Sequence, residues 1–249
     1  LETLDRDRNL LKLLVDELLR YRRKAQSVTR HIGPKASGNL ADSAVTTGAG
    51  VMIVGSNPLL FKLLGARLPH GEALGIRLEF IGFVVSKSDL ELTFALVETL
   101  WHDFLRNPLC AAETEVFFAW MQSTIPIALA GQGGQAFVTM SSDVVHQVFR
   151  HLLCEEGGVD FQSLGPKGFW CLWRYFSVVN MQGKALSVSS VHKNHVVVDD
   201  FFSIQGLDTL WEAFTTSADH TVVKEAGDLF AQLHLRLTEP SDKQRVWDR

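Results

Sequence analysis

The sequence predicts an all-α protein, a right-handed α-α superhelix built from armadillo- or HEAT-like helical repeats. Three observations lead to this class. From Glu72 onward, apolar residues recur at three- and four-residue spacing, in helix-length segments separated by short Gly, Pro, Ser or Asn connections. β-branched runs are scarce, and the run at residues 196–198 is too short to organise a sheet. Finally, one aromatic motif recurs along the chain.

The recurring motif is apolar-x-x-Leu-Trp-x-x-Phe, and its three copies begin at Val97, Phe169 and Leu207. Its tryptophans, Trp101, Trp173 and Trp211, lie 72 and 38 residues apart, which fits a unit of roughly 36–40 residues with one degenerate copy. A hairpin of two helices cannot bury its apolar face alone. We therefore expect neighbouring units to stack and the tryptophans to pack in the shared core.

Four segments follow from the pattern. Residues 1–32 form an N-terminal helix with a leucine stripe, and the basic cluster at 20–24 is interpreted as cations near its C-terminal end. Residues 33–71, rich in glycine and without helical period, form a flexible linker. The solenoid occupies 72–240, and 241–249 begin a further segment. The missing initiating Met and the uncapped C-terminus predict a piece of a longer protein.

Within the solenoid, two helix starts carry recognisable chemistry. Ser88 and Glu91 have the spacing of a capping box. Pro166, after Gly165, suits the first turn of a helix, where its missing N–H costs nothing. Helices are predicted near residues 72–86, 89–106, 112–130, 141–154, 165–181, 207–218 and 219–237.

The amino-acid composition argues against several classes of binding partner. With 249 residues, of which 46% are hydrophobic, the chain can bury a substantial core. Twenty-four Lys and Arg against 28 Asp and Glu give a net charge of −4, which argues against nucleic acid or an anionic membrane as partner. No apolar run is long enough to span a membrane. Three scattered cysteines and no N-x-[ST] acceptor suit a reducing compartment, so we expect a cytoplasmic protein, with the nucleus as an alternative.

Candidate chemical motifs are weak. The glycine-rich residues 131–134 lack the Lys and Ser/Thr of a phosphate loop, and His192 and His195 have no second ligand pair for a metal. Cys110 lies in a short connection without a recognisable nucleophile motif, whereas Cys154 and Cys171 fall in apolar segments and are expected to be buried. We therefore predict no catalytic, cofactor-binding or metal-ligating residue, no cofactor and no small-molecule ligand. The remaining polar candidates are interpreted as solvated turns and helix ends: Glu155, Glu156, Asp199, Asp200 and His220.

The order and spacing of several apolar and aromatic residues resemble one protein family. That family is the very large fat-facets-type ubiquitin-specific proteases, in the helical-repeat region N-terminal to the catalytic domain. The resemblance covers roughly residues 72–237, and its most specific element is Gly-Leu-Asp-x-Leu-Trp at 206–211. It is carried by Glu72, Arg77, Leu78, Phe80, Leu100, Trp101, Phe118, Ala119, Trp120 and Met121, by residues 168–173 with Val179 and Asn180, and by Ala226 and Leu229.

The resemblance implies an intracellular, thiol-dependent deubiquitinase in which this segment is a curved helical scaffold. The family's catalytic Cys and His boxes have no counterpart here, so the segment itself is expected to perform no chemistry. Its expected partners are proteins and ubiquitinated substrates. The alternative is a protein-binding armadillo or HEAT adaptor without enzymatic activity, which would be distinguished by the absence of a protease domain from the full-length chain.

Overall fold

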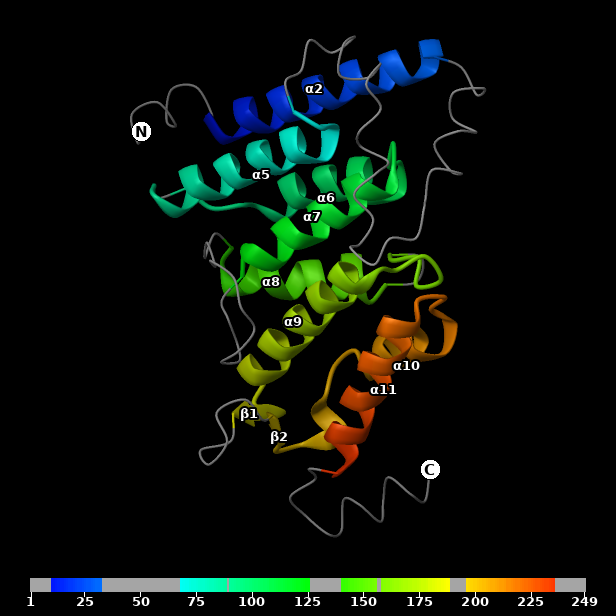
Figure 1. Ribbon diagram of the computed structural model, residues 1–249. Helices are drawn as coiled ribbons and strands as arrows, with labels where there is room; N and C mark the ends of the chain where they lie inside the picture. The colour runs from blue at the N-terminus through cyan, green and yellow to red at the C-terminus, as the bar shows by residue number, and fades with distance from the viewer. Residues whose placement is uncertain are drawn as a thin grey trace. The chain divides into compact units, whose positions relative to one another are not determined.

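The computed structural model describes residues 10–32, 68–88, 90–125, 140–155, 158–188 and 196–235, and these are overwhelmingly helical (Figure 1). The predicted all-α class is confirmed. Two compact units divide the chain, Leu1–Trp120 and Met121–Arg249.

The first unit contains α2 (Leu10–Ile32), α5 (His70–Ser86), α6 (Phe94–Trp101) and α7 (Ala111–Ser123) as far as Trp120. A π-helical turn, His102–Arg106, continues α6. Helix α2 packs against α5 (Figure 1), so the N-terminal helix shares one unit with the start of the predicted solenoid. The predicted linker covers residues 33–71. Its residues 33–67 lie outside the described residues, and α5 begins at His70, so the last two residues of the predicted linker are helical.

Apolar stripes and aromatic rings form the core of the first unit. All four residues of the first motif copy are buried, as predicted. The Trp101 ring lies edge-on to Phe118, with centroids 6.0 Å apart, and Phe104 stacks on Phe117 at 5.4 Å. Such offset and edge-to-face pairs add to the stabilisation that comes from burial alone.

The predicted capping box before α6 is wrong. The helix begins at Phe94, and the cap is Thr93, whose hydroxyl oxygen accepts from the backbone N–H of Leu96. The Ser88 hydroxyl instead donates to the Val84 carbonyl at 2.7 Å, in the last turn of α5. Ser88 therefore satisfies the end of one helix rather than the start of the next.

The second unit contains α8 (Ser142–Val148), α9 (Pro166–Gln182), α10 (Leu207–Thr216) and α11 (His220–Leu235). Between α9 and α10 lie two antiparallel strands, β1 (Leu186–Val188) and β2 (Val196–Val198), and a 3-10 turn. The expectation that residues 196–198 organise no sheet is therefore wrong locally, because residues 186–188 supply a partner strand. A π-helical turn, Phe149–Leu153, continues α8, and the 3-10 turn spans Phe201–Ser203.

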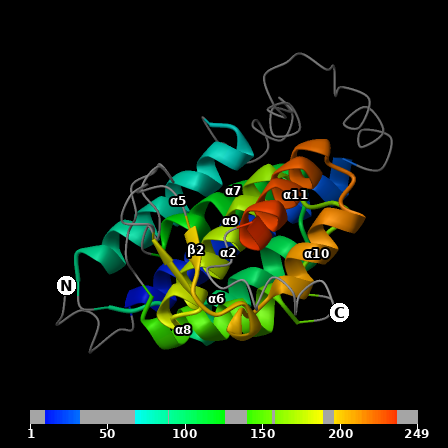
Figure 2. The same ribbon diagram turned by 90° about the horizontal axis from the view of Figure 1, so that it is seen from below.

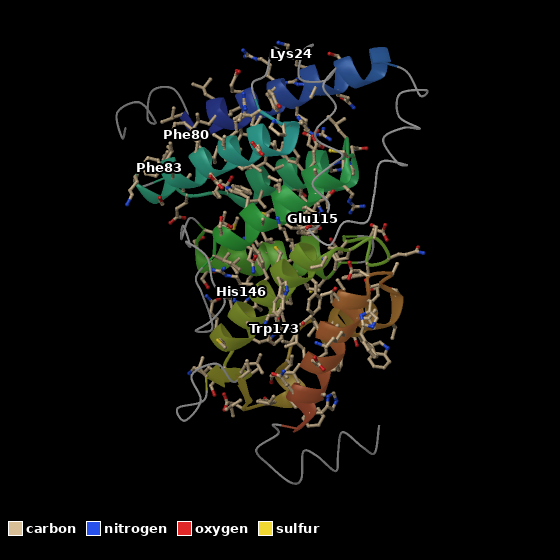
Figure 3. All side chains as sticks on the ribbon, viewed as in Figure 1. Lys24, Phe80, Phe83, Glu115, His146 and Trp173 are labelled. Atoms are coloured by element: carbon tan, nitrogen blue, oxygen red, sulfur yellow. The ribbon has the colours of Figure 1, made fainter. Side chains whose placement is uncertain are left out.

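Helix α9 forms the centre of the second unit. Pro166 occupies its first position as predicted, and every residue from Gly168 to Asn180 except Trp170 is buried, as is typical of a central helix. Trp173 lies on this helix (Figure 3). Its ring is buried and stacks on Phe176, with centroids 5.3 Å apart. Helices α10 and α11 lie side by side, and α11 also contacts α9 (Figures 1 and 2).

Hydrogen bonds from the Asn180 side chain of α9 hold the backbone just before α10. The Asn180 side chain donates to the Gln205 carbonyl at 3.0 Å and accepts from the Gln205 N–H at 2.8 Å. Gly206 follows with φ +81°, and a Cβ there would lie 2.5 Å from Cζ of Phe149. Only glycine fits this position without strain, so the turn and the direction of α10 are strongly specified.

Candidate protein-interaction surfaces

The third tryptophan of the motif lies on the surface. Trp211 is 53% exposed, whereas Trp101 and Trp173 are buried. Helix α10 buries Thr209, Leu210 and Ala213, and its 3.6-residue period therefore turns Trp211 toward solvent. The prediction of core packing is wrong for this copy.

Trp211 belongs to a continuous row of aromatic side chains. Its ring lies edge-on to Phe230 of α11, with centroids 5.5 Å apart, and 5.6 Å from Phe214. Gly227 of α11 makes room for this row, since a Cβ there would approach the Phe214 ring to 3.0 Å. We call the aromatic strip the six residues Phe201, Phe202, Trp211, Phe214, Phe230 and His234.

The row extends beyond Phe230 to the 3-10 turn. His234 stacks on Phe230 at 5.9 Å and lies edge-on to Phe201 at 5.2 Å, and Phe201 is next to Phe202 at 5.8 Å. All six residues of the strip retain solvent exposure. Exposed, clustered aromatic rings are typical of protein-binding surfaces.

Exposed carboxylates border the aromatic strip. Asp208 precedes Trp211 by one helical turn and Glu212 follows it directly, and both are exposed. Asp200 lies next to the strip and caps the 3-10 turn, where its carboxylate accepts from the Phe202 N–H. The surface around the rings is therefore acidic.

A second apolar stripe lies on α5 in the first unit. Ile76, Phe80 and Phe83 are each about half exposed and recur at helical spacing. The opposite side of α5 buries Leu74 and Leu78. Phe80 and Phe83 lie in the second half of the helix (Figure 3). Each of the two units therefore exposes a group of apolar side chains, the α5 stripe in the first and the aromatic strip in the second.

A buried polar network joins four segments of the first unit. Arg22, only 3% exposed, donates from Nε to Oε2 of Glu113 and from Nη1 to Asp103, each at 3.1 Å. It also donates to the Asn107 carbonyl. Glu113 is fully buried and further accepts from the Leu109 N–H at 2.8 Å.

His70 completes this network. Its Nε2 lies 2.9 Å from Oε1 of Glu113, and its Nδ1 lies 3.1 Å from the Tyr21 hydroxyl. The Arg77 guanidinium lies over the Tyr21 ring, 4.0 Å from its centroid. Burial is the main cause of the raised pKa of the Tyr21 hydroxyl. Because His70 and Glu113 are shielded from solvent, we assign the network a role in holding the helices together.

The prediction that residues 20–24 are helix-end cations is wrong. Helix α2 continues to Ile32, and Arg22 lies in its middle with its charge buried. A signal for this was present in the sequence, since Arg22 continues the apolar stripe of Leu11, Val15, Leu18 and Ala25 at spacings of three and four residues. The prediction assigned all the cations of the cluster to the helix end and did not separate Arg22, which lies in the apolar stripe, from its neighbours.

The thiols are unreactive or shielded. Burial raises the pKa of Cys110, raises that of Cys154 to about 11 and raises that of Cys171 further. Such thiols remain protonated at neutral pH and are poor nucleophiles. Cys171 is buried as predicted, whereas Cys154 is partly exposed.

Several sequence candidates do not converge on a site. His220 is exposed at the first position of α11, and Glu155, Asp199 and Asp200 are exposed in turns. Across the described ranges, no three His, Cys, Asp or Glu side chains are grouped as metal ligands. No helix in those ranges has the length and apolarity needed to cross a membrane. Residues 131–134, Glu156, His192 and His195 lie outside the described residues.

Comparison with known proteins identifies related sequences. The family model "UBP24/USP9X/USP9Y ARM repeat" matches residues 1–180. This match includes the N-terminal 71 residues, which lie outside the range of the resemblance seen in the sequence, and it ends before the Gly206–Trp211 element and the aromatic strip.

Curated relatives agree with the family match. "Probable ubiquitin carboxyl-terminal hydrolase FAF" of Drosophila melanogaster is 25% identical over 179 residues. "Ubiquitin carboxyl-terminal hydrolase 9Y" of Mus musculus and of Homo sapiens is 24% identical over 174 residues. Each alignment covers 70% of this chain and 6% of the relative, so the chain spans a small part of the length of these proteins.

Proposed function

Because the chain belongs to the UBP24/USP9X/USP9Y ARM-repeat family, we propose that it is a non-catalytic scaffold segment of a large cysteine-type deubiquitinase. In this role it binds protein partners and positions ubiquitinated substrates for a protease domain elsewhere in the full-length protein. The curated relatives are ubiquitin carboxyl-terminal hydrolases by name, and this chain corresponds to 6% of their length.

The observation that carries the proposal is the exposure of Trp211. The same motif position is buried in two copies and exposed in the third, where the ring continues into a row of aromatic side chains. Stacked helical repeats present extended surfaces to protein partners, and clustered tryptophan and phenylalanine rings supply much of the binding energy at such interfaces. A surface of this kind suits a scaffold better than a catalytic pocket.

We place this activity in the cytoplasm, with the nucleus as an alternative. Cys110, Cys154 and Cys171 are all free thiols. Unpaired cysteines are typical of proteins kept in a reducing compartment. Separation of the full-length protein into cytosolic and nuclear fractions tests this assignment, and recovery from a secretory fraction would contradict it.

The proposed function is tested in the full-length protein. Two substrates are compared for the intact protein and for a version that lacks this segment: ubiquitin-rhodamine, which needs only the protease domain, and mixed ubiquitin-protein conjugates. Equal cleavage of ubiquitin-rhodamine with slower hydrolysis of the conjugates supports a scaffold. Unchanged hydrolysis of both substrates would refute it, and a full-length protein inactive on both would favour an adaptor without enzymatic activity.

A further inference from the structure

The part of the chain that carries the aromatic strip has a charge balance unlike that of the rest. Residues 196–235 contain seven Asp or Glu and one Lys, a net charge of −6 with neutral histidines, whereas the whole chain has −4. Lys224, the single cation of that range, lies 3.9 Å from Asp228. Five of the seven carboxylates are exposed: Asp199, Asp200, Asp208, Glu212 and Asp228.

This combination of rings and carboxylates selects a type of ligand. A cation over the face of an exposed indole is attracted by its π electrons, and a guanidinium does so while also pairing with a carboxylate through two N–H groups. Trp211 offers the indole, and Asp208, three residues earlier on the same side of α10, offers the carboxylate, while Glu212 adds to the negative charge of the helix. The adjoining rings of Phe230 and Phe201 can take apolar side chains of the same ligand.

Charge also argues against other occupants. A second copy of this chain docked through the same surface would oppose carboxylates with carboxylates, because a two-fold contact pairs a patch with itself. Nucleic acid and anionic lipid are repelled by the same field. A basic protein segment is the occupant that the surface complements.

We propose that the aromatic strip is a docking site for a basic, arginine-bearing segment of a protein partner, with an arginine stacked on Trp211. The proposal rests on the scaffold function and names the chemistry of one class of its partners. It concerns residues beyond the part of the chain that the family model matches.

Fluorescence anisotropy on the 249-residue chain tests the proposal with a short labelled peptide in which arginine alternates with leucine. We expect saturable binding that weakens as NaCl is raised. Trp211→Ala is expected to weaken binding by about 30-fold, the loss typical of an interface hot spot. The double variant Asp208→Asn with Glu212→Gln is expected to weaken it about fivefold and to flatten the salt dependence.

The matched control is Leu13→Ala, which removes an apolar side chain of similar exposure, 52% against 53%, from α2 of the other unit and outside both candidate surfaces. It is expected to leave the dissociation constant unchanged. A second control peptide replaces arginine by glutamate and should not bind. Thermal melts of all variants should match the parent chain, since every substituted side chain is exposed.

Five results would overturn the proposal. Three are losses of specificity: no binding of the arginine peptide, equal binding by Trp211→Ala, or equal binding of the glutamate peptide. Binding only after removal of residues 236–249 would assign the strip to the chain's own C-terminal segment, and a dimer in sedimentation that Trp211→Ala abolishes would assign it to a second copy. Because this assay needs no protease domain, its failure is separable from failure of the scaffold function, which the conjugate assay measures.

Discussion

Replacing the buried carboxylate of Glu113 by glutamine is expected to destabilise the first unit strongly. Glu113 is fully buried and holds Arg22, which is itself only 3% exposed, at 3.1 Å. Glutamine keeps the shape of the side chain and one oxygen acceptor but removes the charge that neutralises the guanidinium. Asp103 would remain as the other carboxylate on Arg22, and it is partly exposed.

The expected loss follows from the cost of removing the fully buried carboxylate from the buried Arg22 charge, because the carboxylate that remains, Asp103, is partly exposed. Breaking a buried ion pair by removing one member costs about 3–5 kcal/mol. In a chain of this size, 1 kcal/mol corresponds to about 2–4 °C in Tm, so the expected drop is on the order of 10 °C. Circular dichroism during heating and urea titration measure the two quantities independently.

The same substitution at Glu17 provides the control. Glu17 pairs with Arg20 at 3.2 Å on the exposed side of α2, and surface pairs of this kind contribute about 0–1 kcal/mol. The double variant Arg22→Met with Glu113→Gln should recover part of the stability, because no buried cation is left unpaired. If Glu113→Gln melts together with Glu17→Gln, the account of the network is refuted.

Three further predictions concern the second unit. Trp173→Ala should lower the free energy of unfolding by about 3–5 kcal/mol and Trp211→Ala by less than about 1 kcal/mol, because the first ring is buried and the second is exposed; equal urea midpoints would contradict this. Gly206→Ala should lower the free energy of unfolding by more than about 1 kcal/mol, since the φ of Gly206 is +81° and a Cβ would meet Phe149. A thermal melt unchanged from the parent would disprove this. Burial raises the pKa of the Cys154 thiol from the ordinary 9.0 to about 11. The folded state therefore favours the neutral thiol. The contribution of this pKa difference to the free energy of unfolding is complete below pH 9 and is lost as the pH rises through 11. The unfolding free energy of the parent should therefore fall more steeply than that of Cys154→Ala over this range, and parallel pH curves would exclude the effect.

Helix positions were predictable because apolar spacing is a local property of the chain. The predicted segment 165–181 corresponds to α9, Pro166–Gln182, and 207–218 corresponds to α10, Leu207–Thr216. Cap chemistry was less reliable, since Ser88 and Thr93 both suit a cap and only the structure shows which helix each one serves. Short-range pattern therefore places helices better than it assigns their ends.

The surface could not be predicted in the same way. The motifs around Trp173 and Trp211 have the same residue pattern, but the burial of each tryptophan depends on which helices pack against it. Trp173 lies on the central helix α9, and Trp211 lies on a helix that buries Leu210 and Ala213 instead. Arg22, by contrast, lies in an apolar stripe, and that position in the sequence already distinguishes it from its solvated neighbours.

The proposed function, in which this chain binds proteins within a deubiquitinase and does not itself cleave ubiquitin, is tested most directly by ubiquitin-rhodamine hydrolysis. The 249-residue chain and the full-length protein that contains it are assayed side by side at equal concentration. The account predicts cleavage by the full-length protein and none by the chain. Cleavage by the isolated chain, or by neither protein, would contradict it.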